Sequence, residues 1–215
     1  MITIDALVFD LDGTLVDSRR DLASSVQFLQ EHYGAPRSSE AEVADFVGDG
    51  VAKLVQRALP KLPPSGLDPA IATFKKFYRK HCLDHTRVYP GVRETLQHFR
   101  QKKMAIVTNK PVRVSGYMLD RLGLSPYFLV LIGGDSLPYK KPHPEPIWNA
   151  LKTMGIINAK RVVVVGDGPY DVLAAKAAGV RSCGIKSNIG DHHKLMNSKP
   201  DHLISRMKEM VHIFS

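Results

Sequence analysis

A short apolar run near the start of the chain leads directly into two carboxylates, and this stretch limits the possible folds more than any other. Residues 6–9 are all apolar, Asp10 follows them at once, and Asp12 stands two positions later, before Gly13. So short an apolar run predicts a strand buried on both faces, as in a parallel sheet. Asp10 would then lie at the carboxyl end of that strand, where open α/β sheets bind their ligands.

The spacing of the two carboxylates indicates a bound cation. Asp10 and Asp12 would repel each other unless a cation or a shared proton lies between them. Carboxylate oxygens are the ligands that hard cations such as Mg²⁺ prefer. The plainer alternative is a strand that ends in a polar turn, with both aspartates as ordinary turn residues. We expect a magnesium site here, and later stretches of the chain must agree with it.

The periodicity of apolar residues divides the chain into two parts. Residues 16–86 carry only helical patterns, in about four segments. Beyond them, apolar runs alternate with helical patterns, which predicts a doubly wound parallel sheet with right-handed crossovers. Further strands are expected at residues 104–107, 129–132, 162–165, 180–185 and 202–204. The expected architecture is a discontinuous α/β core domain of residues 1–15 and 87–215, interrupted by an inserted helical cap domain of residues 16–86.

Composition is that of an ordinary globular protein. Of the 215 residues, 44% are hydrophobic and 24% are charged, enough for an α/β domain with a small companion. No apolar run is long enough to span a bilayer, and the first residues lack the pattern of a signal peptide. Cys82 and Cys183 lack metal-site spacing, which favours free thiols in a reducing compartment. We expect a cytoplasmic protein without a membrane partner, either a monomer or a homodimer.

The excess of basic residues is spread along the chain. Thirty Lys and Arg residues against 21 Asp and Glu residues give a formal net charge of +9. Without a continuous basic run, solvated helix faces are favoured over a nucleic-acid surface. We therefore expect no nucleic-acid partner, although a positive field would help to recruit an anionic substrate.

Phosphate-binding groups follow two of the later strands. Thr108 and Asn109 end the strand expected at 104–107, where a hydroxyl and backbone amides can bind phosphate oxygens. Lys141, directly before Pro142, lies in the loop after the next strand and can neutralise phosphate or carboxylate charge. The alternatives are a common strand-to-turn pair and a surface basic pair, Lys140 and Lys141, with Lys140 expected on the solvent side.

Two more carboxylates follow the strand at 162–165. Asp167 comes after a glycine that lets the backbone approach a ligand closely. Asp171 stands four residues later, near the start of a predicted helix, where it could simply complement the helix dipole. Each of these motifs is weak alone, but together they place polar residues at the carboxyl ends of four predicted strands.

The four motifs together resemble those of the haloacid dehalogenase superfamily, most of whose members are phosphatases. Residues 10–15, which read Asp-Leu-Asp-Gly-Thr-Leu, are similar to the first motif of that superfamily, and the other three follow in the expected order. Gly168 departs from the pattern, which usually has a small hydroxyl residue there; this leaves the stiffness of the loop open. Further stretches resemble the phosphoglycolate phosphatase-like members, namely residues 47–50, 121–128, 133–135 and 199–204.

The resemblance implies a Rossmann-like core with a helical cap and hydrolysis of a small phosphate monoester through an aspartyl-phosphate. Asp10 would be the nucleophile, and Asp12 the general acid and base. Mg²⁺ would be held by an Asp10 oxygen, the Asp12 backbone carbonyl and Asp167, with Asp171 behind these ligands. The most specific expectation is conversion of 2-phosphoglycolate to glycolate.

Other residues are assigned to the phosphoryl group and to the cap. Thr108, Asn109 and Lys141 would take up the charge of the phosphoryl group, with Thr108 and Lys141 counted as catalytic. Gly48, Gly50 and nearby Lys53 are candidates for contact with the far end of the substrate, although an ordinary turn and a surface lysine explain them equally well.

Several functions remain open at this point. A pyrophosphatase, a sugar-phosphate or nucleotide phosphatase, or a phosphomutase of the same superfamily would share all four motifs. A receiver-like phospho-acceptor domain also combines acidic residues, magnesium, a threonine and a lysine, but it is shorter and has no helical insert. The sequence also predicts a solvated loop at residues 191–193, and core positions for Trp148, Tyr127 and Phe128.

Overall fold

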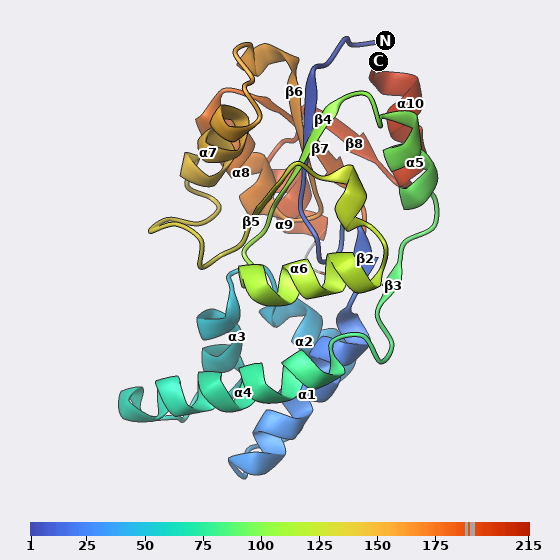
Figure 1. Cartoon of the computed structure of the whole chain (residues 1–215). Coiled ribbons are helices and arrows are strands. Elements are labelled where there is room, and N and C mark those ends of the chain that lie inside the picture. The colour runs from blue at the N-terminus through green and yellow to red at the C-terminus, as the bar shows by residue number, and fades with distance from the viewer. Residues whose placement is uncertain (188, 190–191) are drawn as a thin grey trace.

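The computed structural model describes residues 1–187, 189 and 192–215, and in this part of the chain the main sheet has six parallel strands (Figure 1). Their order is β5-β4-β1-β6-β7-β8, so the first strand of the chain lies in the middle of the sheet. The bounds are β1 (Ala6–Phe9), β4 (Lys103–Val107), β5 (Val130–Ile132), β6 (Val162–Gly166), β7 (Arg181–Ile185) and β8 (His202–Ile204). Each predicted strand is present to within about two residues.

The strand order creates a topological switch point at β1. The chain runs from β1 to its neighbour β4 and outward to β5, and then returns to β6 on the other side of β1. The carboxyl ends of β4, β1 and β6 therefore lie side by side. Open sheets of this kind bind their ligands at such a point.

Helices cover both faces of the sheet because successive strand residues point in opposite directions. Ala6 and Val8 pack with α7 and α8 on one face, and Leu7 and Phe9 pack with α5, α6 and α10 on the other. These helices are α5 (Val92–His98), α6 (Val112–Arg121), α7 (Glu145–Thr153), α8 (Pro169–Ala178) and α10 (Met210–Ile213). The doubly wound arrangement is thus the observed one.

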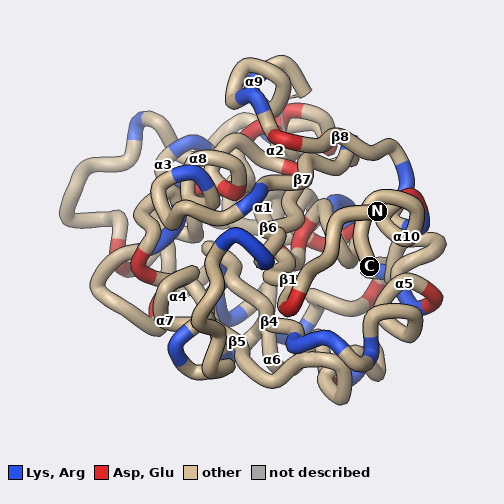
Figure 2. The backbone as a smooth tube through the Cα atoms, turned by 90° about the horizontal axis from the view of Figure 1, so that it is seen from above, with Lys and Arg blue, Asp and Glu red and all other residues tan. Residues whose placement is uncertain are grey.

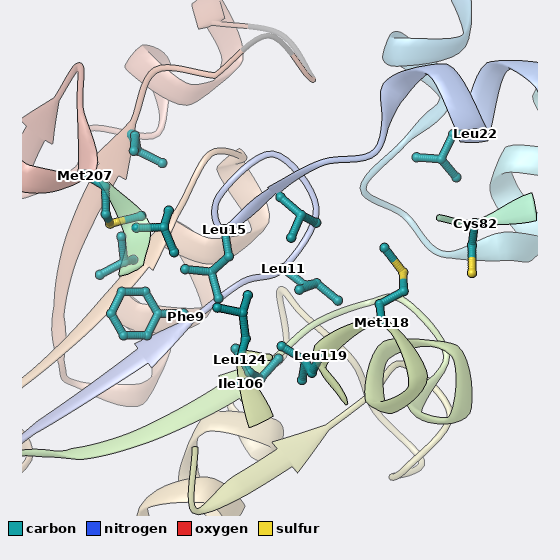
Figure 3. Close-up of a cluster of buried hydrophobic side chains, with 14 of the residues drawn as sticks. Phe9, Leu11, Leu15, Leu22, Cys82, Ile106, Met118, Leu119, Leu124 and Met207 are labelled. Carbon is teal, nitrogen blue, oxygen red and sulfur yellow. The ribbon is translucent and has the colours of Figure 1, made fainter. Parts of the chain in front are cut away.

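A block of four helices lies beyond the carboxyl ends of the strands, as Figure 1 shows. The block consists of α1 (Arg19–His32), α2 (Glu40–Phe46), α3 (Val51–Ala58) and α4 (Leu67–His81), with a short 3₁₀ turn before α4. A capping box of Ser39 and Glu42 begins α2. Helix α4 begins at Leu67, with Gly66 as its N-cap. Phe9 in the sheet and Leu22 in this block belong to one cluster of buried side chains, part of which is drawn in Figure 3.

The two connections between the helical block and the core are held together. Strands β2 (Val16–Asp17) and β3 (Arg87–Val88) form an antiparallel pair, too short to be predicted from periodicity. Beside this pair, the buried carboxylate of Asp21 accepts hydrogen bonds from the backbone N–H groups of His85 and Thr86. We propose that the boundary between the cap domain, residues 16–86, and the core domain, residues 1–15 and 87–215, runs through this pair.

Some local predictions are wrong. His192 and His193 begin helix α9 (His192–Asn197) instead of lying in a loop, and Asp191 is outside the described residues. Trp148 is half exposed rather than in the core, because α7 turns this side chain outward while its indole N–H reaches the Ala178 carbonyl. Phe128 does contact the core: its ring packs edge-to-face against that of Phe9, with the ring centroids 6.1 Å apart.

The charged residues and the two cysteines are arranged as the sequence predicts. In Figure 2, Lys and Arg residues are spread around the molecule and interspersed with Asp and Glu. Cys82 and Cys183 are both buried and free. Across the described residues, every helix is too short or too polar to cross a membrane.

Candidate active site

A cavity of about 940 Å³ lies between the carboxyl ends of the central strands and the helical block. All nine residues that the sequence assigns to the site line it, although they come from five separate stretches of the chain: Asp10, Asp12, Gly48, Gly50, Thr108, Asn109, Lys141, Asp167 and Asp171. The parallel sheet brings these stretches together because β1, β4 and β6 are neighbours.

Three carboxylates and one lysine form the centre of this cavity. Oxygens of Asp10, Asp167 and Asp171 lie within 4.8 Å of one another. Lys141 Nζ lies 2.5 Å from Asp171 Oδ1 and 3.0 Å from Asp10 Oδ1, and the lysine side chain is only 3% exposed. Lys140 instead donates to the Asp49 carbonyl in the helical block. The lysine that the sequence places in the site is therefore the one that reaches it.

The cluster carries more negative charge than the lysine balances. Burial and the charges of Asp10 and Asp171 raise the pKa of Asp167 well above its usual value. Burial also raises the pKa of Asp171 to about 6, although Lys141 beside it acts in the opposite direction. Three ionised carboxylates against one ammonium leave two negative charges uncompensated in a buried place.

This charge pattern fits a divalent cation. Asp10 Oδ1 is buried and has no hydrogen-bond partner within the described chain, since Lys141 approaches it without hydrogen-bonding geometry. Carboxylate oxygens in a group this compact are suitable ligands for a hard cation such as Mg²⁺. The residues present therefore fit the metal that the sequence predicts. The structure places the Asp171 carboxylate in the same group as Asp10 and Asp167.

Residues that the sequence did not single out hold Asp167 in place. Its carboxylate accepts hydrogen bonds from Thr14 Oγ1 at 3.2 Å and from Ser187 Oγ at 2.8 Å. Gly13 has φ +78°, and a Cβ at this position would stand 2.0 Å from an Asp167 oxygen. Glycine is required here for both reasons. Thr14 lies within the first motif, a signal that could have identified it; nothing nearby in the sequence marks Ser187.

The Asp12 carboxylate belongs to a second polar group. It accepts hydrogen bonds from Ser18 Oγ at 2.6 Å and from Lys110 Nζ at 2.8 and 3.1 Å. Lys110 also donates to the Tyr78 hydroxyl of α4. Burial disfavours the charged form of Lys110, but Asp12 and Tyr78 outweigh it and raise the pKa of this lysine. Lys110 follows Thr108 and Asn109 directly, which is the signal that sequence analysis overlooked.

Thr108 and Asn109 occupy the end of β4. Both are buried, and both line the cavity. The Asn109 side-chain amide donates to the carbonyls of Gly48, at 2.8 Å, and Lys141, at 2.9 Å. Asn109 thus connects the core loop that carries Lys141 to the helical block.

The turn at residues 47–50 rests on the core. Gly48 is fixed by Asn109, and Gly50 lies against Lys140, whose Nζ would be 2.9 Å from a Cβ at position 50. Both glycines line the cavity, whereas Lys53 is exposed and is not among the residues that line it. A role for Gly48 and Gly50 in substrate contact remains a prediction.

Comparison with known proteins identifies the family. Residues 7–185 match a family model described as haloacid dehalogenase-like hydrolase. The chain belongs to the haloacid dehalogenase-like hydrolases. The resemblance inferred from the four motifs is thereby confirmed.

Relatives in this hydrolase family share nearly the whole chain. A phosphoglycolate phosphatase of Chromobacterium violaceum is 38% identical over 195 residues, which are 87% of this chain and 87% of that protein. Another, of Pseudomonas syringae pv. tomato, is 38% identical over 212 residues, covering 95% of this chain and 78% of that protein. A crystal structure described as a predicted phosphoglycolate phosphatase from Haemophilus somnus matches with a TM-score of 0.92 at 31% identity, covering 98% and 97% of the two chains.

Proposed function

We propose that this protein is a Mg²⁺-dependent phosphatase that converts 2-phosphoglycolate to glycolate through a phosphoryl group carried on Asp10. The observation that carries the proposal is the buried group of three carboxylates around Lys141, at the end of the central strand. The substrate is suggested by relatives named phosphoglycolate phosphatase that are 38% identical to this chain.

The first step transfers the phosphoryl group to the protein. A carboxylate oxygen of Asp10 attacks phosphorus, and the bond from phosphorus to the substrate oxygen breaks with its electron pair on that oxygen. The Asp12 carboxyl group donates a proton to this leaving oxygen. Lys141, together with Thr108 and Asn109, takes up the charge of the phosphoryl group.

The second step returns the protein to its starting state. Asp12, now a carboxylate, accepts a proton from a water molecule that attacks phosphorus, and the bond between phosphorus and Asp10 breaks. Phosphate leaves, and Asp12 is again protonated for the next turnover. A helical block that closes over the cavity would exclude bulk water, and the turn with Gly48 and Gly50 would face the far end of the substrate.

The metal would be held by the Asp10 carboxylate, the Asp12 backbone carbonyl and Asp167, with Asp171 supporting these ligands through Lys141. When bound, Mg²⁺ supplies positive charge that offsets the repulsion between Asp10 and the phosphate group.

Substrate assays test the proposal. Purified protein is given 2-phosphoglycolate, pyrophosphate, hexose phosphates, a nucleotide and p-nitrophenyl phosphate, each with Mg²⁺ and with EDTA. We expect many turnovers that stop on chelation, with 2-phosphoglycolate among the best substrates. Pyrophosphate or a sugar phosphate far ahead of it would overturn the substrate assignment. A single stable phosphorylation without turnover would instead indicate a receiver-like domain.

The same proposal places the enzyme in the cytoplasm, as a monomer or a homodimer acting on a small phosphorylated metabolite. The buried, free thiols of Cys82 and Cys183 support a reducing compartment. Light scattering on the purified protein decides between the two oligomeric states.

A further inference from the structure

Lys110 joins Asp12 to the helical block. Its ammonium group lies 2.8 Å from Asp12 Oδ2 and 3.1 Å from Asp12 Oδ1, and it donates to the Tyr78 hydroxyl at 2.7 Å. The same ammonium stands 4.5 Å from the centre of the Tyr78 ring. Asp12 belongs to the core and Tyr78 to helix α4, so Lys110 contacts both parts of the fold at once.

The contact between Lys110 and Asp12 is almost completely buried. The Lys110 side chain is 5% exposed, and that of Asp12 is 12% exposed. A charged pair removed from water to this degree is stable only when both partners are well hydrogen-bonded. Among the residues that the structure describes, Lys110 is the one basic side chain paired with Asp12. Together with Ser18, it engages both carboxylate oxygens and so fixes the orientation of the carboxyl group.

We propose that Lys110 is a positioning residue that holds the Asp12 carboxyl group toward the leaving oxygen of the substrate, and that Tyr78 makes this hold depend on the position of α4. The role rests on the phosphatase function proposed above, in which Asp12 transfers protons. If α4 moves away from the core, Tyr78 moves with it, and Lys110 loses one of its two partners. The position of the helical block and the orientation of Asp12 are thereby coupled.

A comparison of leaving groups isolates this role. From phosphoglycolate, the glycolate oxygen leaves as a strongly basic alkoxide and needs a proton from Asp12, whereas p-nitrophenolate leaves p-nitrophenyl phosphate without one. The ratio kcat/KM reports the steps up to formation of the phosphorylated enzyme. Loss of Asp12 positioning should therefore lower kcat/KM for 2-phosphoglycolate much more than for p-nitrophenyl phosphate.

The variants are Lys110→Met, Asp12→Asn, the double variant and Tyr78→Phe. General acid catalysis contributes about 10²–10⁴ in rate, so we expect Lys110→Met to lower kcat/KM for phosphoglycolate at least about 10-fold, and that for p-nitrophenyl phosphate less than about 3-fold. Tyr78→Phe keeps the ring and should lie between wild type and Lys110→Met. Lys160→Met, at an exposed lysine remote from the cavity, is the matched control and should behave as wild type.

The double variant separates positioning from other roles. If Lys110 acts through Asp12, Lys110→Met adds no further loss once Asp12 is Asn. Because Lys110→Met leaves Asp12 unpaired, thermal unfolding is measured for each variant; the double variant and Tyr78→Phe carry the test if Lys110→Met does not fold.

Two results would overturn the inference. Equal losses for the two substrates would mean that Lys110 acts by its charge on the phosphoryl group, and additive losses in the double variant would mean that it acts independently of Asp12. The proposed function fails separately, if the wild-type protein turns over neither substrate or if Asp12→Asn keeps full activity toward phosphoglycolate.

Discussion

Replacement of Asp171 by Asn should stabilise the metal-free protein while weakening its response to magnesium. Asp171 is buried beside Asp10 and Asp167, and its pKa is raised from 3.8 to about 6. A raised carboxyl pKa means that the folded state favours the neutral form, so ionisation costs stability at pH values above about 6. A rise of about 2 in pKa corresponds to about 3 kcal/mol. Asn removes this cost, but its single side-chain oxygen can accept from the Gly168 N–H or from Lys141 and not from both, so about 3 kcal/mol is the upper limit of the gain.

The assay is thermal unfolding in EDTA and in Mg²⁺ across a range of pH. For a chain of this size, about 3 kcal/mol corresponds to a Tm rise of about 6–12 °C in EDTA at pH 7.5. The gain should shrink as the pH falls through 6 and vanish below about 4, where the Asp171 carboxyl group is neutral in both the folded and the unfolded wild-type protein.

Magnesium should narrow the difference in stability between the two proteins. Saturating metal stabilises the wild type by about 2.7 kcal/mol at 100 times its Kd, and the variant by less. Asp45→Asn, which removes an exposed carboxylate on α2, is the matched control and should change stability by less than about 0.5 kcal/mol. A variant that is less stable than wild type in EDTA, or that Mg²⁺ stabilises equally, would refute the account of the cluster.

Three further substitutions test other parts of the account. Asp10→Asn should abolish turnover, with residual activity below about 10⁻³ of wild type, and an unchanged circular dichroism spectrum; substantial activity would remove Asp10 as nucleophile. Gly13→Ala should weaken Mg²⁺ binding, measured by calorimetry, and cost about 1–3 kcal/mol, because a Cβ there meets Asp167 at a φ of +78°. Asp21→Ala should cost about 1–3 kcal/mol in urea unfolding by leaving the N–H of Thr86 without its acceptor; an unchanged midpoint would contradict this.

The sheet was predictable because burial on both faces imposes a simple pattern on the sequence. Runs such as residues 162–165 contain only valine, and each such run became a parallel strand. Polar residues at the ends of these runs could be assigned to one site because parallel strands end at the same edge. The site residues could therefore be predicted without knowledge of the side-chain packing.

Contacts between distant parts of the chain could not be predicted in this way. The pairing of Lys110 with Asp12 and Tyr78 depends on how α4 lies over the sheet, and no local pattern encodes that position. The β2–β3 pair is two residues long on each side, below the length at which alternation is visible. Trp148 was assigned to the core by its residue type, but the face of α7 on which it lies decides its exposure.

The central claim is that Asp10 carries the phosphoryl group. Rapid acid quench of the enzyme during turnover of 2-phosphoglycolate, followed by peptide mass spectrometry, tests it directly. We predict a phosphoryl group on Asp10 that disappears when the substrate is exhausted. A phosphoryl group on a different residue, or rapid turnover with Asp10 never modified, would contradict the account.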